Sequence, residues 1–279
     1  MQSLNISSSA LRGIQLALDT TANNLANLDT IGYKRQTSTF SELLADTMNE
    51  QPAKDMQNRN TPEGLRLGSG ARLGLNRLDL GQGSMKQTDI PTDLMIEGEG
   101  FFLVSREIRD ANDAPVGEEF RFTRDGAFRL QESAYHGGFV LVNSSGYYLT
   151  NEIGAPLVIP EDEVRDFTVS PDGYITANGN NTFERVGVWK VDNPDQLQQV
   201  GSNLFDAGLD VNQNPAEVYS LSWDNGIASL RQGALEASNV HLQEEMSQLI
   251  NIQRAYQLNS RAIAISDQMM SIANSIRSR

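Results

Sequence analysis

The sequence predicts an α+β protein in which two terminal helices pair as a discontinuous α-helical coiled coil and enclose an inserted antiparallel β domain. Three observations predict this fold. Apolar residues repeat in heptads at both ends of the 279-residue chain, alternating apolar and polar residues fill its middle, and Asp-Gly turns punctuate that middle. We expect a terminal helical assembly domain at 1–30 and 238–279, an extended connecting region at 31–93 and 206–237, and the antiparallel β domain at 94–205.

The C-terminal stretch from Ser238 contains no Gly or Pro and predicts a long helix. The residues that recur every seven positions are Leu242, Leu249, Tyr256, Ile263 and Met270, and Met246, Gln253, Ser260 and Asp267 lie between them at a four-and-three interval. Ser238 or Asn239 is expected to cap the start of this helix. A single helix with such a seam needs a partner helix.

The N-terminal stretch supplies a matching seam. Its residues at seven-residue spacing are Leu4, Leu11, Leu18 and Leu25, and Ser8, Gln15 and Ala22 lie between them. Because half of the positions in both seams are small or polar, each helix alone is expected to be weak and to need neighbours for order. The alternative is two amphipathic helices packed on the central domain of a monomer, but heptads at both termini favour the paired helices.

The segment after the first helix reads as a connection. The helix is expected to end near Leu28, before Gly32. Residues 39–48 (TFSELLADTM) fit a short helix, and the polar residues 51–64, with two prolines, fit an extended segment. A disordered surface loop is the alternative for the second stretch.

The middle of the chain carries strand signals. LMIEGEGFFLV at 94–104 reads as two strands around a glycine turn, and 120–130 (FRFTRDGAFRL) and 167–179 (FTVSPDGYITANG) each read as strand, Asp-Gly, strand. Asp-Gly favours a hairpin because both residues tolerate positive φ. We therefore expect Gly126 and Gly173 to occupy positive φ within antiparallel hairpins.

Composition argues against catalysis and cofactors. The chain has no cysteine, which excludes disulfides and thiol chemistry, and it has two histidines in different expected domains. Neither a nucleophile–histidine site nor a histidine-based metal site is expected, so we predict no catalytic, metal-binding or cofactor-binding residues. No apolar run approaches the length of a membrane span, and no cleavable signal is visible at the N-terminus.

Charge is distributed unevenly along the chain. Residues 1–40 and 240–279 each carry a net charge of +1, so the acidic side chains behind the net charge of −14 lie in the middle. Near-neutral ends can pack against copies of themselves, whereas a strongly acidic middle repels nucleic acid. We expect neither nucleic-acid binding nor membrane insertion.

Four motifs in the same order resemble those of the bacterial flagellar rod, hook and hook-associated axial proteins. They are ANNLANLDTIGYKR near the N-terminus, IEGEGFFLV and TRDGAF in the middle, and SNVHLQEEMSQLINIQRAYQLNSRAI near the C-terminus. The positions that carry the terminal motifs are Asn23, Asn24, Asn27, Gly32, Tyr33, Gln253, Arg254, Tyr256 and Asn259. The stretch TPEGLRLGSGAR with the following GSMKQTD most resembles the distal rod type, including the form found in Gram-positive bacilli.

The resemblance implies a self-assembling structural subunit of the flagellar basal body. Paired terminal helices would line the inner tube of a helical homopolymer, and the β domain would lie outside it. The implied partners are other copies, other rod and hook proteins, and the flagellar export apparatus, which would export the chain without a cleaved signal peptide. The alternative function is a carboxylate-dependent cell-wall glycosidase exported with the flagellum, since paired acids can hydrolyse glycosides.

Overall fold

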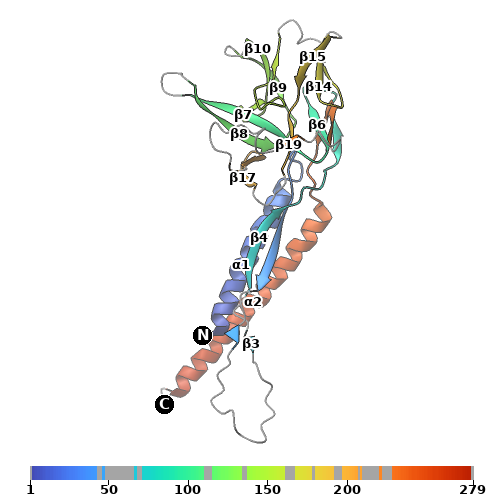
Figure 1. The fold of residues 1–279 in the computed structure, drawn as a ribbon. Coiled ribbons are helices and arrows are strands. Elements are labelled where there is room, and N and C mark those ends of the chain that lie inside the picture. The colour runs from blue at the N-terminus through green and yellow to red at the C-terminus, as the bar shows by residue number, and fades with distance from the viewer. Residues whose placement is uncertain are drawn as a thin grey trace, which may run out of the picture. The chain divides into compact units, whose positions relative to one another are not determined.

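A computed structural model describes residues 2–42, 46–47, 66–67, 71–109, 115–133, 137–160, 167–177, 180–191, 197–206, 208, 220–221 and 228–277. The fold is α+β, with a helix near each end of the chain and antiparallel strands between them (Figure 1). The chain divides into two compact units. Unit 1 comprises residues 1–26, 36–79 and 241–279, and unit 2 comprises residues 27–35 and 80–240.

Unit 1 contains both helices and two short antiparallel ladders. Its elements are α1 (Gln2–Ala26), β1 (Gln36–Glu42), β2 (Asp46–Thr47), β3 (Arg66–Leu67), β4 (Ala71–Leu78) and α2 (Leu242–Arg277). Strand β1 pairs with β4, and β2 pairs with β3. The segment expected to be extended, residues 51–64, lies outside the described part of the chain.

The short helix expected at 39–48 is wrong where the structure can test it. Residues 39–42 belong to β1, which pairs with β4 with a register shift between Ser38 and Phe40. The stretch QTSTFSE alternates β-branched and aromatic residues with polar ones, and such residues favour a strand once a partner strand is available. Pairing with β4 therefore overrides the helix expected at residues 39–42.

The long C-terminal helix begins later than expected. Helix α2 starts at Leu242, and the carbonyl of His241 accepts the N–H groups of Glu244 and Glu245, each at 3.1 Å. Asn239, one of the two expected caps, instead accepts the backbone N–H of Arg35 at 2.7 Å. The prediction that Ser238 or Asn239 caps the helix is therefore wrong.

Unit 2 is built from antiparallel strands. Its largest sheet follows the order β12-β10-β11-β7-β8-β18-β17, with β9 beside β10 and with β16 and β19 beside β7. The strands of this sheet are β7 (Phe101–Arg109), β8 (Pro115–Thr123), β9 (Arg129–Ser133), β10 (Gly138–Val142), β11 (Tyr148–Leu149), β12 (Val158–Ile159), β16 (Val188–Lys190), β17 (Gln198–Gly201), β18 (Leu204–Asp206) and β19 (Ser220–Leu221).

Smaller ladders complete unit 2. They pair β13 (Phe167–Val169), β14 (Tyr174–Ala177) and β15 (Asn180–Arg185) in order, β20 (Ala228–Gln232) with β6 (Leu94–Gly98), and β21 (Ala234–Glu236) with β5 (Met85–Gln87). The core of this unit is apolar and includes Leu94, Phe102 and Phe128. The rings of Phe102 and Phe128 pack edge to face, with their centroids 5.5 Å apart. Burial of this cluster is the main stabilising term for the unit.

Only one of the two expected Asp-Gly hairpins forms. Strands β13 and β14 pair across Asp172 and Gly173, and Gly173 has a φ of 83°. In contrast, β8 pairs with β7 and β18 while β9 pairs with β10, so the strands flanking Gly126 do not pair with each other. Gly126 is also absent from the positive-φ positions, and the prediction for it is wrong.

Candidate assembly interface

Helices α1 and α2 run antiparallel in unit 1 (Figure 1). One buried asparagine, Asn24, joins the C-terminal end of α1 to the start of α2. The Asn24 side chain donates to Glu245 Oε2 at 3.2 Å and to the Gln36 carbonyl at 2.8 Å, and its oxygen accepts the Gln36 N–H at 3.0 Å. Both Asn24 and Glu245 are buried. Asn24, a residue of the terminal motif, thus links three segments of unit 1.

The buried face of α1 lies beside the predicted leucine column. Leu11, Leu18 and Leu25 are half-buried, and the side chain of Leu4 lies outside the described part of the chain. Gln15 and Ala22 are exposed, and the buried positions are Gly13, Ile14, Ala17, Thr20, Thr21 and Asn24. The buried hydroxyls are satisfied within the helix, because Thr20 and Thr21 donate to the carbonyls four residues earlier.

The sheltered face of α2 also lies beside the predicted seven-residue column and does not coincide with it. Leu249 and Ile263 are half-buried, while Leu242, Met246, Tyr256 and Met270 are exposed. The other sheltered positions are Glu245, Ile252, Asn259 and Ser266, which follow the seven-residue column by three, together with Ala255 and Ser260. Of the residues expected between these seven-residue positions, Met246, Gln253 and Asp267 are exposed in the single chain, and their place in a helix interface stays a prediction.

Residues repeated every seven positions on a helix can share a face with residues either three or four positions further along the chain. In α2 the sheltered residues three positions further along include Glu245, Asn259 and Ser266. Because these side chains are polar, the hydropathy pattern did not predict that they would be sheltered. Two of these polar groups are hydrogen-bonded, since Glu245 accepts from Asn24 and Asn259 donates to the Ala255 carbonyl.

The segment between α1 and β1 belongs to unit 2 and is held there by a buried ion cluster of Lys34, Arg124 and Glu236. Glu236 lies 2.7 Å from Lys34 Nζ and 3.1 Å from Arg124 Nη1. The three side chains are 1%, 3% and 2% exposed for Lys34, Arg124 and Glu236. Burial lowers the pKa of Arg124, and the charge of Glu236 opposes that shift.

Backbone contacts fix the same segment. The N–H of Gly32 donates to the Glu236 carbonyl at 2.8 Å, and Asn203 donates to the Ile31 carbonyl at 2.7 Å. Gly32 has a φ of 68°, and a Cβ there would lie 2.5 Å from the backbone nitrogen of Asp125. This motif position therefore requires glycine on two independent grounds.

The remaining motif residues occupy different environments. Tyr33 is buried in unit 2, and Asn27 accepts the Thr30 hydroxyl at 3.1 Å. In unit 1, Asn259 donates to the Ala255 carbonyl within α2. Asn23, Gln253, Arg254 and Tyr256 are exposed. The motif therefore combines positions that hold the single chain together with positions that this chain leaves on its surface.

Sequence reasoning missed the roles of Lys34, Arg124, Glu236 and Glu245. Each of the first two lies inside a motif already noted, GYKR and TRDG, and Glu236 lies two residues before the start of the C-terminal motif. For Lys34 and Arg124, the place of an ionisable side chain inside a motif was the available signal. Their pairing across more than a hundred residues was not visible in the sequence.

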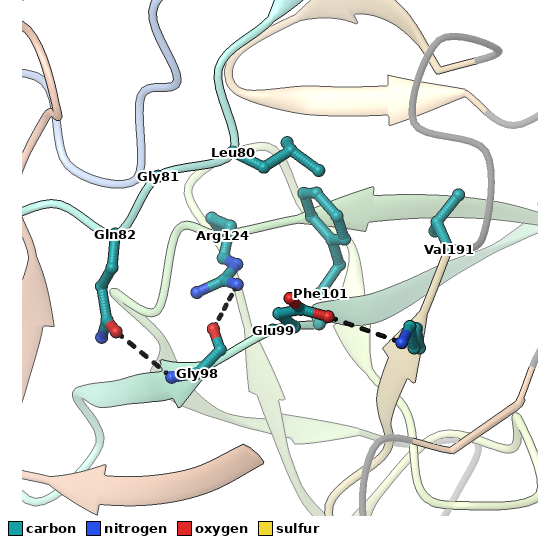
Figure 2. A pocket seen from close by; sticks show the side chains of 10 residues that line it. Leu80, Gly81, Gln82, Gly98, Glu99, Phe101, Arg124 and Val191 are labelled. Carbon is teal, nitrogen blue, oxygen red and sulfur yellow. Dashed lines mark hydrogen bonds and ion pairs between the residues drawn. The ribbon is translucent and has the colours of Figure 1, made fainter. Parts of the chain in front are cut away.

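Unit 2 also contains an open cleft of about 650 Å³ lined by ten residues, including Phe101, Arg124 and Lys190 (Figure 2). Its charged groups are already engaged. Arg124 Nη2 donates to the Gly98 carbonyl at 2.7 Å, and Lys190 lies 3.5 Å from Glu99. These pairings give the cleft no arrangement of nucleophile and base.

Among the described residues no three potential ligands gather into a metal site. The described helices also include none that is both long and apolar enough to cross a membrane. The surfaces that remain to be explained are those of the two helices.

Three family profiles match the chain along its length. They are the flagella basal body rod protein at residues 4–34, the flagellar hook protein FlgE/F/G D1 domain at 95–177, and the flagellar basal body rod FlgEFG protein C-terminal region at 231–276. The terminal profiles contain the two helices, and the middle profile lies in unit 2.

Whole-length relatives agree with these profiles. The flagellar hook-basal body complex protein FlhP of Bacillus subtilis is 36% identical and covers 99% of this chain and 100% of its own length. The flagellar basal-body rod protein FlgG of Borreliella burgdorferi is 32% identical over 99% of both chains, and FlgG of Bacillus subtilis is 29% identical over 97% of both. These names describe structural rod proteins rather than enzymes, and nothing here supports the glycosidase alternative. The chain belongs to the family of flagellar basal-body rod and hook proteins.

Proposed function

We propose that this chain is a structural subunit of the bacterial flagellar basal body that self-assembles into the distal rod or the rod–hook axial structure. Membership of the rod and hook family supports the proposal. The observation that carries it is the surface of α2, where large apolar side chains from Leu242 to Ile276 are exposed along the helix. A helix with so much exposed apolar surface is typical of an interaction site.

Assembly would use the terminal helices, paired as a coiled coil. The proposed interface contains Leu4, Leu11, Leu18, Leu25, Leu242, Met246, Leu249, Tyr256, Ile263 and Met270. Support comes from the half-buried Leu249 and Ile263 alongside the exposed Met246 and Tyr256, since partial shelter in one chain leaves surface for neighbouring copies. The near-neutral charge of both ends favours this packing.

The remaining assignments follow the same proposal. The terminal domain (1–30 and 238–279) would form the inner part of the polymer, the connecting region (31–93 and 206–237) the next layer, and the β domain (94–205) the outer layer. The partners would be further copies, other rod and hook proteins, and the flagellar export apparatus. The chain would reach the basal body without a cleaved signal peptide.

The test combines polymerisation with localisation. Purified full-length chain should form tubular polymers visible by electron microscopy, and antibody should label basal bodies of isolated flagella. Ile263→Asp should abolish polymers, because it places a charge on the half-buried helix face. Gln257→Asp, at an exposed position of α2, should not. A chain that stays monomeric at every concentration and is absent from basal bodies would contradict the proposal.

A further inference from the structure

The cleft in unit 2 opens beside a buried ion cluster that is one negative charge short. Lys34 and Arg124 carry two positive charges, and Glu236 supplies one negative charge to both of them. The three side chains are at most 3% exposed, so bulk water screens their charges little. Arg124 is the member of the cluster that lines the cleft (Figure 2). The cleft therefore borders a buried region with an excess of positive charge, which favours an anion there.

Arg124 has donors that its present partners do not use. A guanidinium group carries five N–H donors. Nη1 donates to Glu236 at 3.1 Å and to the Ile96 carbonyl at 3.5 Å, and Nη2 donates to the Gly98 carbonyl at 2.7 Å. The buried Nε has no hydrogen-bond partner among the described residues. A carboxylate that lies against Arg124 would accept from Nε and from the second N–H of Nη2, in the two-point contact that guanidinium groups favour.

A second cation lies in the wall of the cleft. The side chain of Lys190 is 32% exposed, and its Nζ lies 3.5 Å from Glu99 Oε2. Because the Glu99 side chain is 72% exposed, solvent screens this pair and its contribution is small. Lysine carries its three donors on a flexible stem, so this ammonium can turn toward an anion. An anion beside Arg124 would thus have a second positive group in the same cleft.

The rest of the cleft consists of apolar side chains and bare backbone. Leu80 and Val191 are half-buried, and the centroid of the Phe101 ring lies 5.5 Å from the guanidinium carbon. Gly98 and Gly100 have φ values of 105° and 139°, which residues with a side chain rarely adopt. Glycine at both positions keeps this wall free of side chains. The resulting volume of about 650 Å³ falls within the range of small-molecule sites.

We propose that this cleft binds a small organic carboxylate. The carboxylate group pairs with Arg124 and Lys190. The aliphatic body packs on Leu80, Phe101 and Val191. A monoanion is favoured because one negative charge balances the ion cluster, and its binding stabilises unit 2. Carboxylate binding in unit 2 goes beyond the proposed structural role and does not require self-assembly.

Nuclear magnetic resonance of the unpolymerised full chain, with isotope-labelled arginine, tests the site with hexanoate as the probe. Hexanoate should shift the Nε–H signal of Arg124, which is identified by its loss in an Arg124→Lys variant. Hexanamide has the same length but no charge and should leave the signal in place, as should sodium chloride at equal ionic strength. Arg231 is exposed and lies outside the cleft, so its signal serves as the internal control.

Two variants separate the cleft from the rest of the surface. Lys190→Gln changes a partly exposed side chain and should weaken hexanoate binding by about threefold or more, because it removes the second cation. Lys86→Gln removes an exposed lysine of β5 outside the cleft and should leave binding unchanged. Hexanoate should also raise the melting temperature of the wild-type chain more than hexanamide does.

Four outcomes overturn the proposal. The first is an Arg124 signal that does not move at any concentration of hexanoate that leaves the chain folded. The second is an equal shift with hexanamide or sodium chloride, which indicates apolar contact alone or an unselective anion effect. The third is equal hexanoate affinity in wild type and Lys190→Gln. The fourth is loss of hexanoate binding on polymerisation, which assigns the cleft to a carboxylate side chain of a neighbouring copy.

Discussion

At the scale of single residues, the Glu236 carboxylate joins the most distant parts of unit 2. It lies within ion-pair distance of Lys34 and Arg124, and it also accepts the Gly83 N–H at 2.8 Å. Two buried cations therefore share one anion. A carboxylate in this position keeps the segment after α1 and the strand before α2 in one cluster.

Removing that charge should destabilise unit 2 strongly. Glu236→Gln removes the anion that forms ion pairs with the buried Lys34 and Arg124, and breaking a buried pair in this way costs about 3–5 kcal/mol. The matched control is Glu97→Gln, since Glu97 and its partner Arg231 are both exposed. That change should alter stability by less than about 1 kcal/mol. The free energies of unfolding of both variants are measured in urea. Equal losses in the two variants would contradict the stabilising role of the Lys34, Arg124 and Glu236 cluster.

Asp125 should make unit 2 less stable as pH rises. Burial raises the pKa of Asp125, with a smaller contribution from the Asp93 charge, while the hydrogen bond from the Ala127 N–H opposes the shift. A folded pKa above the unfolded value means that the folded state binds more protons, so stability falls as pH rises from the unfolded pKa through the raised one.

The substitution Asp125→Asn tests this sign. Asparagine keeps an oxygen for the Ala127 N–H, which now lies 3.0 Å from Asp125 Oδ1, but carries no charge. The variant should melt at a higher temperature than wild type at pH 7, and the difference should shrink as pH falls toward 4. A variant that is less stable at neutral pH, or a difference that grows in acid, would contradict the assignment.

Gly126 and Gly146 need glycine for different reasons. A Cβ on Gly126 would lie 1.6 Å from the Leu94 carbonyl oxygen, whereas Gly146 has a φ of 80° and no atom near the Cβ position. Gly126→Ala should cost about 3 kcal/mol through overpacking against backbone. Gly146→Ala should cost about 1 kcal/mol through left-handed strain alone. Thermal unfolding should give a lower melting temperature for Gly126→Ala than for Gly146→Ala. The reverse order would contradict the close approach of the Leu94 carbonyl to Gly126.

At the scale of elements, the helix pair depends on polar contacts as much as on its leucines. Asn24 lies between α2 and the start of β1, and all of its side-chain polar atoms are hydrogen-bonded. Without it, the backbone groups of Gln36 lose their partners at the end of α1.

Asn24→Ala should therefore loosen the helix pair. Leaving buried donors and acceptors unsatisfied costs about 1–3 kcal/mol. Asn23→Ala changes the exposed neighbour and should stay within about 0.5 kcal/mol of wild type. Amide hydrogen exchange in α1 of the monomer reports the difference. Equal exchange in both variants would show that the asparagine bridge does not stabilise the pair.

Elements with strong local signals were predictable from the sequence, and those set by distant partners were not. The two helices and the hairpin at Gly173 follow from heptads and from an Asp-Gly turn. Residues 39–42 form a strand because they pair with β4. Gly126 does not have a positive φ because the strands on either side of it, β8 and β9, pair with other strands and not with each other. The three-residue offset of the helix faces was hidden because Glu245 and Asn259 are polar.

At the scale of the whole molecule, the chain combines a unit that has a large apolar core with a unit whose helix α2 exposes many large apolar side chains. Unit 2 buries Leu94, Phe102 and Phe128 among many others, which supports folding without partners. In unit 1, α2 leaves apolar residues exposed on two sides. The motif positions that carried the family resemblance divide in the same way, with Tyr33 buried and Tyr256 exposed.

The central claim is that subunits join through the two helices of unit 1. Amide hydrogen exchange measured on the same chain as monomer and as polymer tests it most directly. The account predicts that polymerisation slows exchange mainly within residues 2–26 and 242–277, while the core strands of unit 2 are already protected in the monomer and change little. Increased protection confined to unit 2, with both helices exchanging as fast in the polymer as in the monomer, would contradict the account.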